Sequence, residues 1–330
     1  MTTRTATVRA HANIALAKYW GKADVARNLP AVPSLSLTLA AMRTTTEVSF
    51  APELERDELF LAGVAQQGRP LERASKLLNE VRGIAGVTSL ARVRSFNDFP
   101  TASGLASSAS GFAALALGAT QALGLELPLE RVSALARAAS ASAARSLFGG
   151  YVELAAGAES ARRVTAPEHW PLKMLVAVTS EAAKDTGSTD GMQHTARTSP
   201  YYPSWVADAP RLFAEVKAAV LARDFERLAP AVEQSALMMH ASMLAASPAL
   251  IYFRPATLAV IEVVRAQRRA GLAACFTIDA GPHVKVLVEP RDAASVRAAL
   301  AGAEGVLRVL ESEAGPDAQL LANGAPELLR

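Results

Sequence analysis

Cysteine is almost absent from this chain of 330 residues, because Cys275 is the only one. A single cysteine cannot form an internal disulfide, and such scarcity favours a reducing compartment, the cytoplasm. The thiol lies in an apolar run at 273–276, where we expect it to pack in the core rather than act as a nucleophile.

Several other signals are missing. The histidines are scattered, with no H-E-x-x-H motif, so no zinc site is expected. The net charge of +3 comes without a long Lys/Arg run, which argues against nucleic acid as a partner and favours small anions. The first ten residues lack the apolar segment of a signal peptide. We therefore expect a cytoplasmic protein that is not embedded in a membrane.

The stretch 97–123 has no charged side chain after Asp98 and carries a Gly/Ser-rich segment that leads into a helix-forming run. Polar residues dilute this run too much for a membrane span. The P-loop pattern G-x-x-x-x-G-K-[ST] is absent. A Gly/Ser loop at a helix N-terminus suits phosphate oxygens, although a buried helix with a flexible entry loop has the same composition.

Two further segments carry isolated cations among small or aromatic residues. Lys18 and Lys22 flank Tyr19 and Trp20, and no acidic residue precedes Asp24. Arg145 lies in a run of Ser and Ala that closes on a Gly pair, at 140–150. Solvated lysines and an exposed turn would explain both, but a ligand with several negative charges would explain them as well.

Hydrophobic periodicity predicts strands and helices throughout the chain. The predicted strands are 5–12, 34–39, 45–50, 93–96, 172–178, 271–278, 284–289 and 306–310. The predicted helices are 72–81, one reaching about 123, 128–140, 204–222, 225–245, 255–270 and 291–301. A composition shift near 166–171 divides the chain into domains 1–170 and 171–330, each with a polar loop before a helix. This pattern predicts an α+β protein with a ligand cleft between two domains.

Five separated segments carry a resemblance to a known family. They are NIALAKYWGK from residue 13, NDFPTASGLASSASG from 97, SASAARSLFGGY from 140, KDTGSTDGM from 184 and FTIDAGP from 276. In this order they resemble diphosphomevalonate decarboxylase, within the GHMP kinase superfamily. The resemblance implies a ribosomal protein S5 domain 2-like N-terminal domain, a ferredoxin-like C-terminal domain and a site in the cleft between them. It also implies a homodimer that uses ATP and Mg²⁺.

The resemblance carries over roles residue by residue. The catalytic set would be Asp279, Lys18, Arg145 and Ser188. The substrate-binding set would be Tyr19, Trp20, Gly21, Lys22, Arg73, Ser140, Ala141, Ser142, Ala143, Ala144, Arg145, Thr189 and Met192. The ATP-binding set would be Asn97, Ala102, Ser103, Gly104, Leu105, Ala106, Ser107 and Ser108, with the last two near a Mg²⁺ held mainly by ATP phosphates.

The implied reaction converts mevalonate 5-diphosphate and ATP to isopentenyl diphosphate, ADP, phosphate and CO₂, a step of isoprenoid biosynthesis. Phosphoryl transfer of this kind depends on positioning and charge neutralisation, which basic residues and Mg²⁺ supply. The chain departs from the family pattern, away from the charged catalytic positions, at Ala141, Ala144, Leu154, Gly187 and His283. Two alternatives stay open: a kinase or decarboxylase acting on mevalonate or its monophosphate, and a silent paralogue that only binds nucleotide.

Overall fold

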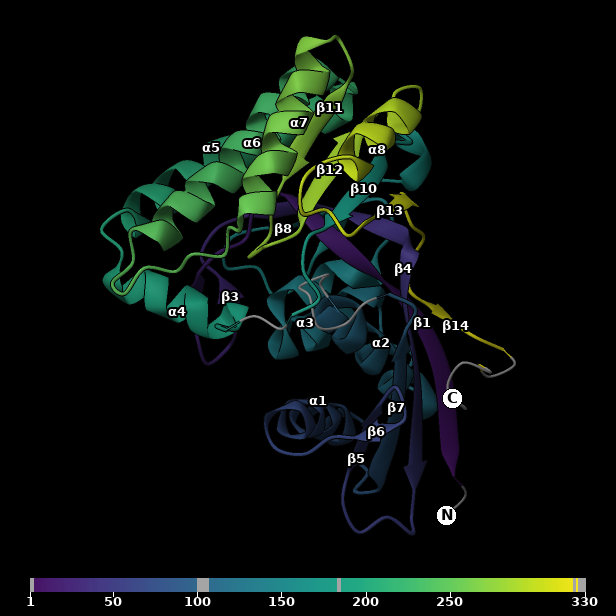
Figure 1. Cartoon of the computed structure of the whole chain (residues 1–330). Helices are drawn as coiled ribbons and strands as arrows, with labels where there is room; N and C mark the ends of the chain where they lie inside the picture. The colour runs from purple at the N-terminus through teal and green to yellow at the C-terminus, as the bar shows by residue number, and fades with distance from the viewer. Residues whose placement is uncertain (1–2, 100–106, 183–184, 323–324, 326–330) are drawn as a thin grey trace.

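The computed structural model describes residues 3–99, 107–182, 185–322 and 325. Two β-sheets and their helices lie one above the other, as Figure 1 shows. The lower half is formed by the N-terminal part of the chain, and the upper half is formed by the C-terminal part. The extreme C-terminal strand returns to the lower half and lies beside the first strand.

The first sheet has eight strands in the order β14-β1-β4-β7-β5-β6; β8 also pairs with β4, and β9 pairs with β8. The strands are β1 (Arg4–Ala17), β4 (Ser34–Ala51), β5 (Glu58–Leu61), β6 (Val64–Ala65), β7 (Leu90–Asn97), β8 (Tyr151–Leu154), β9 (Arg162–Thr165) and β14 (Gln319–Leu320). A small β2–β3 pair, Lys22–Asp24 with Leu29–Pro30, follows β1. The long strand β1 runs antiparallel to β4 and ends beside the cleft.

Helices α1 (Arg69–Ala85), α2 (Ser107–Ala122) and α3 (Leu129–Ala139) accompany this sheet. The alanine-rich α2 packs directly on β1 and β4, and small side chains allow that close approach. Gly118 shows how close the helix lies to the sheet, because a Cβ at this position would be only 3.0 Å from the side chain of Val48. After α3, a 3₁₀ helix (Ala141–Leu147) brings Arg145 into the interior.

The second sheet has four antiparallel strands in the order β11-β12-β10-β13. They are β10 (Lys173–Val178), β11 (Ala274–Thr277), β12 (Val284–Val288) and β13 (Arg308–Glu313). Its helices are α4 (Ser188–Thr198), α5 (Tyr202–Ala222), α6 (Phe225–Leu244), α7 (Pro255–Arg269) and α8 (Ala293–Ala301). α7 and α8 cover one face of this sheet, and the other face turns toward β1.

One hydrophobic cluster, here called the shared core, joins the two halves. It includes Ile14 of β1, Leu37 of β4, Val176 of β10, Val216 of α5 and Val232 of α6, all fully buried. Cys275 belongs to the same cluster, and burial raises the pKa of its thiol. This confirms the packing role predicted for the cysteine.

Most predicted elements are confirmed, with two differences. The predicted strands 34–39 and 45–50 are parts of one continuous strand, β4, in which Arg43 pairs with His11 of β1 and Thr44 pairs with Asn97 of β7. The Ser/Ala run after residue 140 is a buried 3₁₀ helix rather than an exposed turn. Among the described residues, no helix is long and apolar enough to cross a membrane.

Candidate active site

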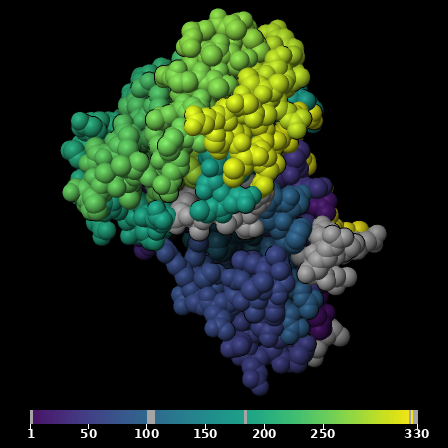
Figure 2. Space-filling model, in the orientation of Figure 1, coloured from purple at the N-terminus to yellow at the C-terminus, as the bar shows by residue number. Residues whose placement is uncertain are grey.

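A cavity of about 730 Å³ opens where the two halves meet. The space-filling view shows the molecule hollowed at this level, between the blue lower half and the green and yellow upper half (Figure 2). Its walls carry residues from β1, α1, α2, the 3₁₀ helix, α4 and the loop after β11. The predicted site residues that line it are Lys18, Tyr19, Trp20, Lys22, Arg73, Asn97, Ser107, Ser108, Ser140, Ala141, Ser142, Arg145, Ser188, Thr189, Met192 and Asp279.

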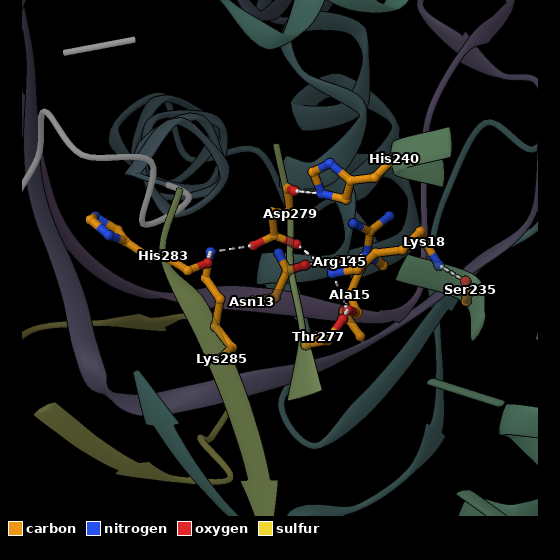
Figure 3. A network of polar contacts seen from close by, with 11 residues as sticks. Asn13, Ala15, Lys18, Arg145, Ser235, His240, Thr277, Asp279, His283 and Lys285 are labelled. Atoms are coloured by element: carbon orange, nitrogen blue, oxygen red, sulfur yellow. Dashed lines mark hydrogen bonds and ion pairs between the residues drawn. The ribbon is translucent and has the colours of Figure 1, made fainter. Parts of the chain in front are cut away.

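Asp279 lies at the centre of the polar contacts in this cavity, directly after β11. Its Oδ1 accepts a hydrogen bond from Lys18 Nζ at 2.8 Å, and its Oδ2 lies 3.1 Å from Lys285 Nζ. The Nε2 of His240 donates to the backbone carbonyl of Asp279 at 2.8 Å and so fixes this turn from α6 (Figure 3). About a quarter of the Asp279 side chain remains open to the cavity.

Burial and neighbouring charges pull the pKa values of this group in opposite directions. Burial alone would raise the pKa of Asp279, but Lys18 and Lys285 outweigh it and hold that pKa well below its usual range. Burial lowers the pKa of Lys18 to about 8, against the opposing effect of Asp279. Burial also lowers the pKa of His240 to about 4, so the imidazole is neutral at pH 7. Asp279 is therefore ionised at neutral pH before a ligand binds.

Arg145 is buried, yet its hydrogen-bond partners among the described residues are all uncharged. Its Nε donates to Ser36 Oγ at 3.1 Å and to Asn13 Oδ1 at 3.3 Å, and its Nη1 donates to Ser34 Oγ at 2.8 Å. Burial lowers the pKa of Arg145 to about 10, which leaves it charged at neutral pH. Within the described part of the chain, no carboxylate comes within ion-pair distance of this guanidinium. A buried charge without a counter-charge is costly unless a ligand supplies one.

Lys22 and Arg73 extend the positive lining toward the mouth of the cavity. Burial lowers the pKa of Lys22, and Arg73 and Arg69 lower it further. Arg73 donates to the carbonyl of Ala139 at 2.9 Å and stacks on the ring of Phe112. These neighbouring positive charges repel one another, and an anionic ligand bound between them would reduce that repulsion.

Two aromatic side chains next to these cations present buried polar atoms without a protein partner. They are Tyr19 Oη and Trp20 Nε1. Buried donors are rarely left unpaired in proteins, so we expect each of these two atoms to form a hydrogen bond with a bound ligand. The carbonyl of Trp20 is held in turn by Trp205 Nε1 at 2.9 Å, which ties this segment to α5.

Three of the residues predicted to hold nucleotide, Asn97, Ser107 and Ser108, line the cavity. Ser107 and Ser108 begin α2, where the helix dipole favours phosphate, and Asn97 ends β7. Ser188 and Thr189 begin α4 across the cavity. Ala102, Ser103, Gly104, Leu105 and Ala106 lie outside the described residues. The described residues contain no group of three or more His, Cys, Asp or Glu that could hold a metal ion. Mg²⁺ prefers oxygen donors, which the serine hydroxyls and a ligand's own phosphates can supply.

Three predicted substrate contacts do not line the cavity. Ala143 and Ala144 pack in the core of the lower half, where their small size lets the 3₁₀ helix lie against α2. Gly21 sits behind Lys22, with φ +111° and no room for a Cβ, which would lie 2.0 Å from Tyr202 Oη. These residues shape the wall without reaching the cavity.

Gly21→Ala should destabilise the protein. The left-handed backbone and the clash with Tyr202 cannot both be relieved cheaply, and strain of this kind costs roughly 1–3 kcal/mol. Denaturant unfolding measures this loss. As a control, Gly83→Ala within α1 has free space around its Cβ and should leave stability equal or higher.

Two residues that hold the predicted site residues in place were not predicted from the sequence. Lys285 lies within the predicted strand 284–289, and a lysine between valines in a buried strand is a signal for such a role. Asn13 stands in the quoted motif but was given no role. Its amide donates to the Ser142 carbonyl at 3.0 Å and to Ser146 Oγ at 2.8 Å, which fastens the 3₁₀ helix to β1.

Two family models together match most of this chain. Residues 10–165 match the diphosphomevalonate decarboxylase-like N-terminal domain, and residues 174–310 match the mevalonate 5-diphosphate decarboxylase C-terminal domain. The diphosphomevalonate decarboxylase of Saccharomyces cerevisiae is 36% identical over 86% of this chain and 77% of its own length. The human enzyme is 35% identical over 85% of this chain and 76% of its own length.

Solved structures agree over the whole fold. Mevalonate diphosphate decarboxylase from Staphylococcus aureus has a TM-score of 0.91 at 36% identity, covering 97% of this chain and 98% of that one. The structure of MDDEF in complex with MVAPP, AMPPCP and magnesium has a TM-score of 0.91 at 38% identity, covering 97% and 99%. The two-domain α+β fold of the GHMP kinase type is thus confirmed, and this chain belongs to the diphosphomevalonate decarboxylase family.

Proposed function

We propose that this protein catalyses the ATP-dependent decarboxylation of (R)-5-diphosphomevalonate to isopentenyl diphosphate. The observation that carries this proposal is the ionised Asp279, open to a cavity whose other charged wall residues are mainly buried or partly buried cations. A binding protein for phosphates would need the cations but would gain nothing from a carboxylate among them. An acid is useful there if it acts on a hydroxyl group or on developing positive charge.

The substrate's anionic groups would be held by the cations around Tyr19 and Trp20. In this arrangement Lys22 and Arg73 would bind the diphosphate. Arg145, together with Ser140 and Ser142, would bind the substrate's other anionic group, its carboxylate, near Asp279. The ATP phosphates lie against Ser107 and Ser108 at the start of α2, and Ser188 faces them from α4. Magnesium, held by these phosphates and hydroxyls, would supply charge neutralisation for the transfer.

In the first step, the 3-hydroxyl oxygen attacks the terminal phosphorus of ATP, the bond to ADP breaks, and the hydroxyl proton passes to Asp279. The transition state is loose, so the proton leaves late and a weak base suffices. Bound anions also raise the pKa of Asp279 above its value in the empty site. In the second step, the C3–O bond breaks and the phosphate leaves. The carboxylate C–C bond supplies the electron pair of the new alkene, CO₂ is released, and the proton on Asp279 returns to the phosphate.

The test is turnover of mevalonate, its 5-phosphate and its 5-diphosphate side by side, with CO₂ trapped and ADP measured. We expect one CO₂ per ADP with the diphosphate. ADP without CO₂ would identify a kinase of the 3-hydroxyl, and turnover only of a less phosphorylated substrate would identify the related decarboxylase. Nucleotide binding without any ADP release would identify a silent paralogue.

The pH dependence should show an alkaline limb from Lys18. As pH rises through about 8, Lys18 in the free enzyme loses its proton, so Asp279 loses a partner and the cavity loses a cation. We therefore expect kcat/KM to fall above about pH 8. Bound anions stabilise the charged form of Lys18, so the limb of kcat should lie at higher pH. Coincident limbs in both profiles would contradict this assignment.

Three further properties belong to the same proposal. We propose that the domains divide at 1–170 and 171–330, that the protein acts as a homodimer, and that it works in the cytoplasm. The two sheets support the division, although β14 crosses back to the first sheet. The single cysteine supports a reducing compartment. Sedimentation of the purified protein tests the dimer.

A further inference from the structure

Lys285 stands on the face of the second sheet that turns toward β1. On β12, Val284, Val286 and Val288 pack with α7 and α8, while Lys285 and Leu287 point the other way. The residues beside Lys285 on the neighbouring strands are Thr277 and Val176. A fully buried lysine among such neighbours is rare and needs a specific reason.

The contacts of Lys285 lead to Asp279. Its Nζ lies 3.1 Å from Asp279 Oδ2 and donates to the His283 carbonyl at 3.4 Å. On the other side of the carboxylate, Lys18 Nζ donates to Oδ1 and to the Ala15 carbonyl, both at 2.8 Å. Figure 3 shows the two lysines approaching the carboxylate from opposite sides. Each oxygen of Asp279 therefore has its own cation.

Folding alone does not account for this second cation. Lys18 already neutralises Asp279, so Lys285 adds a buried positive charge beside Lys18 and the equally buried Arg145, and His240 is neutral there at pH 7. Buried charges contribute little net stability, and an apolar side chain of the same volume often serves as well. The reason for Lys285 is thus expected in the chemistry rather than in the packing.

The two lysines differ in access. Lys18 and Arg145 line the cavity, where anionic substrates compete with Asp279 for them, whereas Lys285 lies behind the carboxylate and is not part of the lining. Anions entering the cavity would weaken the hold of Lys18 on Asp279 and raise the pKa of that carboxyl. A cation out of their reach keeps its effect throughout the reaction.

We propose that Lys285 is a positioning residue that fixes the orientation of the Asp279 carboxylate and keeps it ionised once the anionic substrates have bound. This inference rests on the proposed function, since it concerns the step in which Asp279 meets the 3-hydroxyl. Lys285 touches neither substrate, and it acts only through Asp279.

Lys285→Met tests the proposal, because methionine keeps most of the volume and removes the charge. We expect kcat to fall about 10- to 100-fold, the range found for residues that orient metal ligands, with KM changed less than about threefold. Without Lys285, the pKa values of both Asp279 and Lys18 rise. The acid limb, set by Asp279, and the alkaline limb, set by Lys18, should therefore both move to higher pH, by about 1 unit or more. Lys285→Arg keeps the charge and should restore the limbs.

Lys173→Met is the matched control. Lys173 lies on the adjacent strand β10 but pairs with Glu311 near the surface, so its loss should leave kcat and both limbs in place. If Lys285→Met lowers kcat with the limbs unmoved, or if Lys285→Arg is no better than Lys285→Met, Lys285 is only structural and the proposal is overturned.

A measurement without turnover separates this proposal from the proposed function. Lysines are few in this chain, so ¹³Cε-lysine NMR can follow Lys18 through its titration, assigned with Lys18→Arg. We expect a midpoint near 8 in the wild type and a clearly higher one in Lys285→Met. An unchanged midpoint overturns the coupling even if the wild type is active. An inactive wild type with a shifted midpoint overturns the proposed function and supports the coupling.

Discussion

Asp279→Asn is expected to reduce kcat by about 10²- to 10⁴-fold, the usual loss when a catalytic base is removed. Asparagine keeps the size and the contact with Lys18, but it can neither take up the hydroxyl proton nor balance positive charge at C3. Affinity for mevalonate diphosphate should be kept or increased, because the cavity loses a negative charge. Steady-state kinetics and calorimetric titration measure the two effects separately.

Asp208→Asn serves as the control for this substitution. Asp208 is a half-buried residue of α5 that pairs with the exposed Arg211 and does not line the cavity, and surface pairs contribute at most about 1 kcal/mol. Its activity should match the wild type. An Asp279→Asn variant with near-normal turnover would remove Asp279 from the mechanism.

Arg145→Gln is expected to weaken binding of mevalonate diphosphate about 100-fold, equivalent to ~3 kcal/mol, within the range for losing one partner of a buried charged contact. The glutamine amide can still donate hydrogen bonds to Asn13, Ser34 and Ser36, and the ligand-free protein no longer contains this buried charge. The melting temperature of the empty protein should therefore stay the same or rise. Titration calorimetry and thermal unfolding measure both quantities.

Arg82→Gln gives the opposite pattern and is the matched control. Arg82 is also buried in the lower half, but both of its terminal nitrogens donate to Asp57 at 2.9 Å. Its loss leaves a buried carboxylate unpaired, which typically costs 3–5 kcal/mol of stability, while substrate affinity should be unaffected. If Arg145→Gln instead behaves like Arg82→Gln, its charge serves the fold and not the substrate.

The residues alone predicted much of the fold, because periodicity reports which face of a strand or helix is buried. They failed where tertiary pairing decides. Residues 40–44 have no alternating pattern, and the pairing of Arg43 and Thr44 with β1 and β7 is what the sequence alone does not show. The run around Arg145 was equally consistent with an exposed turn until Asn13, Ser34 and Ser36 were seen to surround it.

The acid and its partner lysine were predicted from motifs 261 residues apart in sequence, through resemblance to a family and not through local chemistry. The Asp-Ala-Gly-Pro turn by itself is an ordinary turn. Lys285 could not be placed in the same way. The role of a lysine in an apolar strand can be inferred only when it is known which face of the sheet packs against the other half of the molecule.

The shared core has a consequence for how the reactive charges meet. Lys18 follows β1 and Asp279 follows β11, and both strands contribute fully buried side chains to this one apolar interior. Because a packed interior resists deformation, the separation between ammonium and carboxylate is set when the chain folds. Nucleotide and substrate thus enter a charge pattern that already exists, and their binding energy is not consumed in assembling it.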